Sequence, residues 1–218
     1  MAANGRNGNR KARDNARIYR TPELGYYFIV TDTEKTEEYY MNGLRDSIPF
    51  DLRGKLVIKV SKASTKNLVE EAKSLMALHP QYGEPWIVFD RDKVKQFDDI
   101  IKKAIDAKIN VGWSNPCIEI WFSAYFGSMP TYQGSVECCK QFSKQFENKT
   151  NLKYTKADKN IYNLLCKYGD EENALLVAEA KLKEQRKKYS VPSQMFPATT
   201  LHELVGEIRV KAKLNKKT

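Results

Sequence analysis

Short apolar runs alternate with stretches of helical periodicity in the first half of the chain. Each run combines β-branched and aromatic residues and is bounded by polar residues or glycine, a pattern typical of buried strands. Between the runs, apolar residues such as Leu68, Ala72 and Leu75 recur close to the 3.6-residue period of a helix. The expected strands span residues 26–30, 55–60, 85–89 and 109–113, and the expected helices between them span 34–44, 65–78 and 94–107.

This alternation of strands and helices predicts an α/β fold with a mainly parallel four-stranded sheet flanked by helices. After residue 116 the pattern becomes helical, and helices are expected over 117–126, 136–146, 158–168, 171–188 and 199–209. We therefore expect a helical C-terminal half that packs on the core. The predicted organisation is a basic arm over 1–20, an α/β core over 21–126, a helical part over 127–210 and a basic tail over 211–218.

Composition adds a prediction about partners. The 218 residues carry a net charge of +10, and basic residues crowd both ends of the chain. Residues 1–20 lack apolar periodicity and are expected to be disordered. Basic ends favour a nucleic-acid partner, because they can contact its phosphates. The alternative explanation is that they only keep the protein in solution.

Other features of the composition limit the class of protein. The chain lacks a run of about 18 apolar residues and a secretion signal, so we expect no membrane segment and a cytoplasmic location. The cysteines are irregularly spaced, which favours reduced, mostly buried thiols over a zinc site or a redox pair. They are Cys117, Cys138, Cys139 and Cys166.

Candidate metal ligands follow three of the predicted strands. Asp32 follows the first strand, Asp90 and Asp92 follow the third, and Asn115 follows the fourth, one helical turn before Glu119. Ligands of parallel sheets gather at the carboxyl ends of the strands, and magnesium prefers carboxylate oxygens. Each residue also has a structural explanation, as an acid in a solvated turn or near a helix start. Their expected convergence on one sheet edge favours a divalent-metal site.

The same segments carry a family resemblance that extends over nearly the whole chain. The chain resembles the RloB-like proteins, which are close to the AbiLii proteins of bacterial abortive infection and belong to the broader Toprim-type nucleases. The matching segments are IVTDTEKTE at 29–37 with Tyr40, WIVFDRD at 86–92, SNPCIEIWF at 114–122, YTK at 154–156 and PATTLHELV at 197–205.

The resemblance implies a Toprim-like core in which Asp32, Asp90 and Asp92 bind Mg²⁺ or Mn²⁺. It also implies a nuclease effector of anti-phage defence that acts with a partner ATPase. Where the family pattern has Cys-Glu-Gly-Glu-Lys-Thr-Glu, residues 31–37 read TDTEKTE, so an aspartate replaces the leading glutamate. Tyr125 stands where a histidine is expected. These departures leave open a shifted or lost metal site.

The alternative third ligands to Asp32 are Glu34 and Glu37. The leading functional hypothesis is metal-assisted cleavage of phosphodiester bonds in RNA, such as tRNA, or in DNA. In it, Glu119 acts as a ligand or proton acceptor and Lys156 stabilises the transition state. The alternatives are a catalytically impaired module that docks on an ATPase and a basic nucleic-acid-binding protein without catalysis.

Overall fold

The structure, a computed structural model, describes residues 24–32, 35–61, 64–92 and 94–214. Within these residues, five strands form one sheet, in the order β2-β1-β3-β4-β5. The first four strands of the chain run parallel, and β5 pairs antiparallel with β4. The strands are β1 Tyr27–Thr31, β2 Leu56–Val60, β3 Glu84–Asp90, β4 Asn110–Asn115 and β5 Ala198–Thr199.

The mainly parallel α/β fold is confirmed, but the predicted number of four strands is wrong. The fifth strand consists of Ala198 and Thr199, and Thr199 was expected to begin a helix. Two residues are too short to show strand periodicity. Hydrogen bonds to β4 hold the segment in place, since the backbone amide of Thr200 donates to the carbonyl of Trp113 at 2.9 Å.

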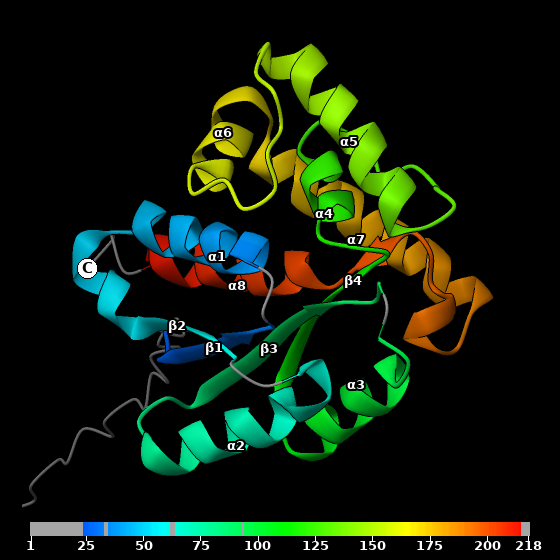
Figure 1. The fold of residues 1–218 in the computed structure, drawn as a ribbon. Coiled ribbons are helices and arrows are strands. Elements are labelled where there is room, and N and C mark those ends of the chain that lie inside the picture. Colours follow the sequence, from blue (N-terminus) through cyan, green and yellow to red (C-terminus); the bar gives the residue numbers. More distant parts are fainter. Residues whose placement is uncertain (1–23, 33–34, 62–63, 93, 215–218) are drawn as a thin grey trace, which may run out of the picture.

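Helices cover both faces of the sheet (Figure 1). One face packs against α2 and α3, and the other against α1 and α8. Because both faces are covered, β1 is buried along its whole length and reads as a continuous apolar run. These helices are α1 Lys35–Ser47, α2 Leu68–Leu78, α3 Phe97–Asp106 and α8 Leu201–Leu214.

Of the remaining helices, α4 contacts β4 and β5 and α7 contacts β5, whereas α5 and α6 lie farthest from the sheet in Figure 1. Helix α7 has the predicted bounds, and Asp170 caps its start by accepting a hydrogen bond from the amide of Asn173 at 3.0 Å. The described part of the chain also contains the short 3-10 helices η1 Phe50–Lys55, η2 Thr65–Asn67 and η3 Pro192–Gln194. The α-helices of this half are α4 Glu119–Ala124, α5 Ser135–Thr150, α6 Ile161–Tyr168 and α7 Glu171–Lys188.

The C-terminal segment belongs to the core. Strand β5 extends the sheet, and the apolar side of α8 is buried in the same cluster as Tyr27 of β1. The α/β core therefore includes segments on both sides of the expected boundary between residues 126 and 127. Helix α8 continues to Leu214, so Lys211 and Lys213 lie in a helix and not in a tail. The basic arm 1–20 and residues 215–218 lie outside the described residues.

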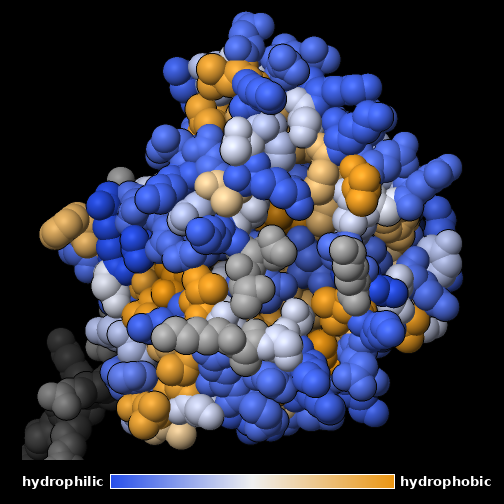
Figure 2. Space-filling view, in the orientation of Figure 1, coloured by the Kyte–Doolittle hydropathy of each residue, from blue (hydrophilic) through white to orange (hydrophobic). Residues whose placement is uncertain are grey.

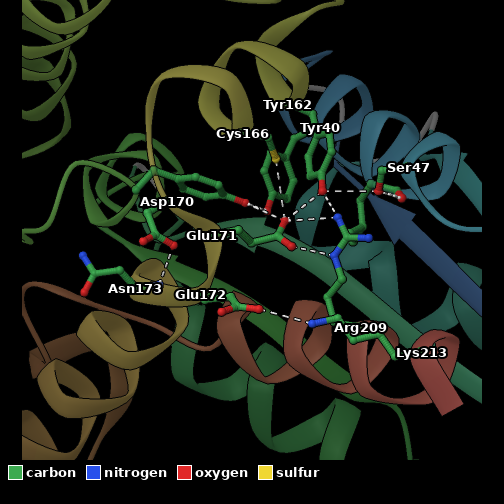
Figure 3. A network of polar contacts seen from close by, with 12 residues as sticks. Tyr40, Ser47, Tyr162, Cys166, Asp170, Glu171, Glu172, Asn173, Arg209 and Lys213 are labelled. Carbon is green, nitrogen blue, oxygen red and sulfur yellow. Dashed lines mark hydrogen bonds and ion pairs between the residues drawn. The ribbon is translucent and has the colours of Figure 1, made fainter.

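A partly buried polar network joins the helical half to α1 and α8 (Figure 3). The carboxylate of Glu171 accepts hydrogen bonds from the hydroxyls of Tyr125 at 3.1 Å and Tyr162 at 2.8 Å. The Arg209 guanidinium on α8 forms an ion pair with this carboxylate at 2.5 Å. Tyr40 on α1 completes the set, because its hydroxyl lies 2.8 Å from that of Tyr125. We call these five residues the Glu171 network.

The face of the molecule shown in Figure 2 is largely polar. Hydrophilic residues cover most of the face shown in Figure 2, and hydrophobic residues occur in smaller groups between them. Among the helices that the structure describes, none combines the length and the apolar character needed to cross a membrane.

Candidate metal centre

A cavity of about 510 Å³ lies where β1 and β3 end and the first turn of α1 begins. Segments from the helical half close its other side, namely the start of α4, the start of α5 and the loop that follows α5. The charged residues that line the cavity are Asp32, Glu37, Asp90, Asp92, Glu119 and Lys156.

The strand ends position the aspartates. Asp32 directly follows β1, and its backbone amide donates to the carbonyl of Val88 on β3 at 3.3 Å. Asp90 is the last residue of β3, and its Oδ2 accepts a hydrogen bond from the backbone amide of Ile118 at 2.9 Å. Parallel pairing of β1 with β3 thus fixes the two acids at the same sheet edge.

Two glutamates from helix starts complete a carboxylate cluster, by which we mean Asp32, Glu37, Asp90 and Glu119. Glu37 lies in the first turn of α1, and Glu119 is the first residue of α4. Both side chains are almost fully enclosed, because each residue is only 1% exposed. Four acids from four separate segments therefore share one partly enclosed space.

Their proximity raises proton affinities. Burial, followed by the charge of Asp32, raises the pKa of Glu37 to about 8. Burial and the charges of Glu37 and Glu119 raise the pKa of Asp90 well above its usual range. The cluster thus resists full ionisation in the absence of a cation.

One oxygen of the cluster has no partner within the part of the chain that the structure describes. Glu37 Oε2 is buried and makes no hydrogen bond there. An unsatisfied buried carboxylate oxygen is costly, and a hard divalent cation would satisfy it and neutralise the repulsion. The donor set, four carboxylates, fits Mg²⁺ or Mn²⁺, which prefer oxygen ligands.

Asp92 occupies the mouth of the cavity. Its side chain is exposed, in contrast to Asp32, Glu37 and Glu119, which are buried, and it accepts a hydrogen bond from the Ser135 hydroxyl at 2.5 Å. Its backbone amide donates to the carbonyl of Pro116 at 2.9 Å, which fixes the turn after β3. Asp92 can therefore reach a bound cation or its water shell from the solvent side.

Lys156 approaches Glu119 from the loop after α5. Its amine lies 3.7 Å from Glu119 Oε1, and its side chain is 60% exposed. Partial burial is the largest single influence on the pKa of Lys156 and acts to lower it, but Glu119, Cys139 and Cys117 together outweigh burial and raise that pKa above the ordinary value. The Tyr154 hydroxyl donates to the same carboxylate oxygen at 3.1 Å. The amide of Ala157 donates to Thr36 Oγ1 at 3.2 Å and fastens this loop to α1.

The structure brings most of the predicted site residues together, including Glu37, which the sequence offered only as a substitute for Asp32. Asn115 is the exception, because it does not line the cavity and its amide donates to the carbonyls of Pro192 and Ser193 in η3. Glu34 lies outside the described residues. Cys117 and Cys139 also line the cavity, which their irregular spacing in the sequence did not indicate.

Comparison with known proteins identifies the family of this chain. Searches of curated proteins and of solved structures found no significant match. The model of the family described as RloB-like protein matches residues 27–208, a range that contains the carboxylate cluster, Asp92 and Lys156. This chain therefore belongs to the RloB-like family.

Proposed function

We propose that this protein is a metal-dependent nuclease that hydrolyses phosphodiester bonds in RNA, such as tRNA, or in DNA. The convergence of the carboxylate cluster on one cavity at the carboxyl end of a parallel sheet carries the proposal. Burying four acids together destabilises a folded protein unless something compensates for their charge. Such an arrangement is typical of sites that bind a cation for phosphoryl chemistry.

Asp32, Glu37 and Asp90 would hold Mg²⁺ or Mn²⁺, with Asp92 at the solvent side. When bound, the cation would polarise the phosphate and lower the pKa of a bound water. Glu119 can accept a proton, since its carboxylate faces the cavity, where Tyr154 donates a hydrogen bond to it and Lys156 forms an ion pair with it.

Positive groups at the cavity favour an anionic substrate. Lys156 lines the cavity, and Lys153 and Lys159 of the same loop are exposed. The start of α5 adds the positive end of a 16-residue helix beside the cavity. A second cavity of about 460 Å³ shares Ser135 and Val136 with the first, which extends the open surface along the start of α5. These features would orient a phosphate backbone across the cluster.

The family resemblance supports the biological part of the proposal. An acid after β1 and Asp-x-Asp after β3 resemble the metal site of Toprim-type nucleases. We infer that the protein acts in the bacterial cytoplasm as an effector of anti-phage defence beside a partner ATPase. An ATPase gene next to the gene for this chain would support this part.

A cleavage assay tests the proposed activity. Purified protein, alone and with a neighbouring ATPase, is incubated with labelled tRNA, other RNA and DNA in Mg²⁺ or Mn²⁺. The matched variants are Asp90→Asn in the cluster and Asp99→Asn, an exposed acid on α3. We expect the wild type and Asp99→Asn to cut a substrate that Asp90→Asn spares.

Two other results would contradict the nuclease. Equal cleavage by Asp90→Asn would place the activity elsewhere or in a contaminant. If the wild type cuts nothing under these conditions, the two remaining hypotheses are separated by binding. Tight, salt-sensitive nucleic-acid binding without metal would favour the binder, and stable capture of the ATPase would favour the docking module.

A further inference from the structure

Two cysteines lie beside Glu119 in the same cavity and have no part in the proposed cleavage. Cys117 precedes α4, and Cys139 lies in α5, so the pair joins two elements that are distant in sequence. Their sulfur atoms are 3.9 Å apart. Together with a carboxylate oxygen of Glu119, these ligand atoms all lie within 4.8 Å of one another.

The spacing of the sulfur atoms is close to that of a tetrahedral metal site. A zinc–sulfur bond of about 2.3 Å at the tetrahedral angle separates two sulfur ligands by about 3.8 Å. A disulfide would need a separation of about 2 Å. The two thiols could therefore take one cation with almost no change in their separation. Glu119, whose oxygen lies within 4.8 Å, needs only a small side-chain rotation to become the third ligand.

We propose that Cys117, Cys139 and Glu119 form a second metal site, next to the carboxylate cluster, for a thiophilic divalent cation such as Zn²⁺. Thiolate ligands select zinc-like cations, whereas carboxylates alone suit Mg²⁺ and Mn²⁺. Three protein ligands leave one coordination position for water. Binding converts both thiols to thiolates and releases two protons for each cation bound.

Lys156 controls access to this site. Its amine lies 3.7 Å from Glu119 Oε1, and its positive charge also acts on Cys139. This charge repels an incoming cation. The Lys156 side chain is more than half exposed and can turn its amine towards solvent. Replacing it with methionine should therefore tighten binding of the thiophilic cation.

The two sites share Glu119, which couples them. A cation held by the two sulfur atoms draws the Glu119 carboxylate away from the cluster. This consequence rests on the proposed nuclease: Zn²⁺ should inhibit cleavage at concentrations far below those of Mg²⁺. The binding itself does not depend on the nuclease activity.

Titration with Co²⁺, which reports thiolate ligands by charge-transfer absorption in the near ultraviolet, tests the site. The full-length protein is reduced with a phosphine, freed of metal and titrated, and Zn²⁺ is then added to displace Co²⁺. We expect one equivalent of Co²⁺ with thiolate absorption. Cys117→Ser and Cys139→Ser should each weaken binding at least about ten-fold, whereas Cys166→Ser, an exposed cysteine on α6, should bind as the wild type does.

The outcomes separate this proposal from the previous one. Asp90→Asn should keep the thiolate absorption, because Asp90 is not a ligand of this site, even though it should lose cleavage. Loss of the absorption in a folded Asp90→Asn protein would overturn a separate site. Undiminished absorption in both cysteine variants, or no absorption in the wild type, would also overturn it. Circular dichroism verifies that each variant is folded, and because Cys139 is only half-buried, its serine variant perturbs packing least.

Discussion

The Glu171 network and the carboxylate cluster both bury acids between the helical half and the core, but with opposite electrostatics. In the network, Arg209 and two tyrosine hydroxyls satisfy the single carboxylate of Glu171. In the cluster, acids face other acids, one buried oxygen of Glu37 makes no hydrogen bond to the described residues, and Lys156 lies at the rim. The network supplies its own counter-ion, whereas the cluster would acquire one from solution.

This difference separates a structural role from a functional one. A paired buried acid fixes the arrangement of the helices around it, and removing its partner is destabilising. A group of acids that raise each other's pKa works against folding, so its presence calls for a ligand. Four measurements test this distinction, in decreasing order of expected effect.

The pH dependence of stability should reveal the cluster most strongly. Because the pKa of Glu37 is raised to about 8, the folded protein keeps a proton that the unfolded chain releases near pH 4.5. The free energy of unfolding of the metal-free protein should therefore fall by on the order of 4 kcal/mol between about pH 5 and pH 8, and level off above. Glu171, with a pKa raised to about 7 by burial, contributes only to the lower part of this window.

Urea denaturation at several pH values in a chelator provides the measurement. Glu37→Gln should reduce the slope near pH 8, where Glu171 is mostly ionised and Asp90 is the other acid with a raised pKa. Saturating Mg²⁺ should also abolish the fall, because a cation holds the carboxylates ionised. A metal-free protein whose stability stays flat or rises over this range would contradict the mutual repulsion of the acids.

Removing the cation of the Glu171 network should destabilise the fold. Arg209→Met leaves Glu171 buried without its ion-pair partner, at an expected cost of about 3 kcal/mol in the free energy of unfolding. Lys213→Ala, which breaks an exposed ion pair with Glu172, is the matched control and should change stability by less than about 0.5 kcal/mol. Equal effects of the two substitutions would show that the network is not a structural anchor.

Neutralising one acid in each region should change stability in opposite directions. Glu37→Gln removes one charge from the repelling cluster and should stabilise the metal-free protein by about 1–2 kcal/mol at pH 8. Glu171→Gln loses the ion pair with Arg209 and should be destabilising. Thermal unfolding of both variants in a chelator measures this contrast. Two losses of similar size would show that the cluster is stabilised by contacts of its own.

Lys156 should have the smallest effect, and on activity rather than stability. Lys156→Met removes a positive charge that faces the substrate phosphate and should lower the cleavage rate about ten-fold, or about 1.4 kcal/mol in activation free energy. Lys102→Met, an exposed lysine on α3 away from the cavity, is the control and should retain near-normal activity. A rate unchanged by Lys156→Met would remove Lys156 from the proposed chemistry.

The sequence predicted those parts of the fold that local pattern determines. Helix α7 was predicted with its observed bounds because it begins at a capping aspartate, and β3 was predicted because its run of apolar residues is continuous. Strand β5 was missed because only its pairing with β4 makes two residues a strand. The placement of α8 on the core likewise arises from tertiary contacts that no local period encodes.

The site shows the same division. Asp90 was found because a strand end orients it, and Asn115 was predicted for the same reason, although its amide instead holds η3. Glu37 could not be ranked above Glu34 without the position of α1 relative to β3. Cys139 approaches Cys117 because of the way α5 packs. The two cysteines are 22 residues apart in the sequence, and this spacing does not indicate a metal site.

Binding of Mn²⁺ tests the central claim most directly, because it asks whether the carboxylate cluster takes a hard divalent cation. Free Mn²⁺ is measured by electron paramagnetic resonance as it is titrated into wild type, Asp90→Asn and Asp99→Asn. We predict saturable binding by the wild type and by Asp99→Asn, and a loss of affinity of at least about ten-fold in folded Asp90→Asn. Equal binding by all three proteins, or no binding by the wild type, would contradict the account.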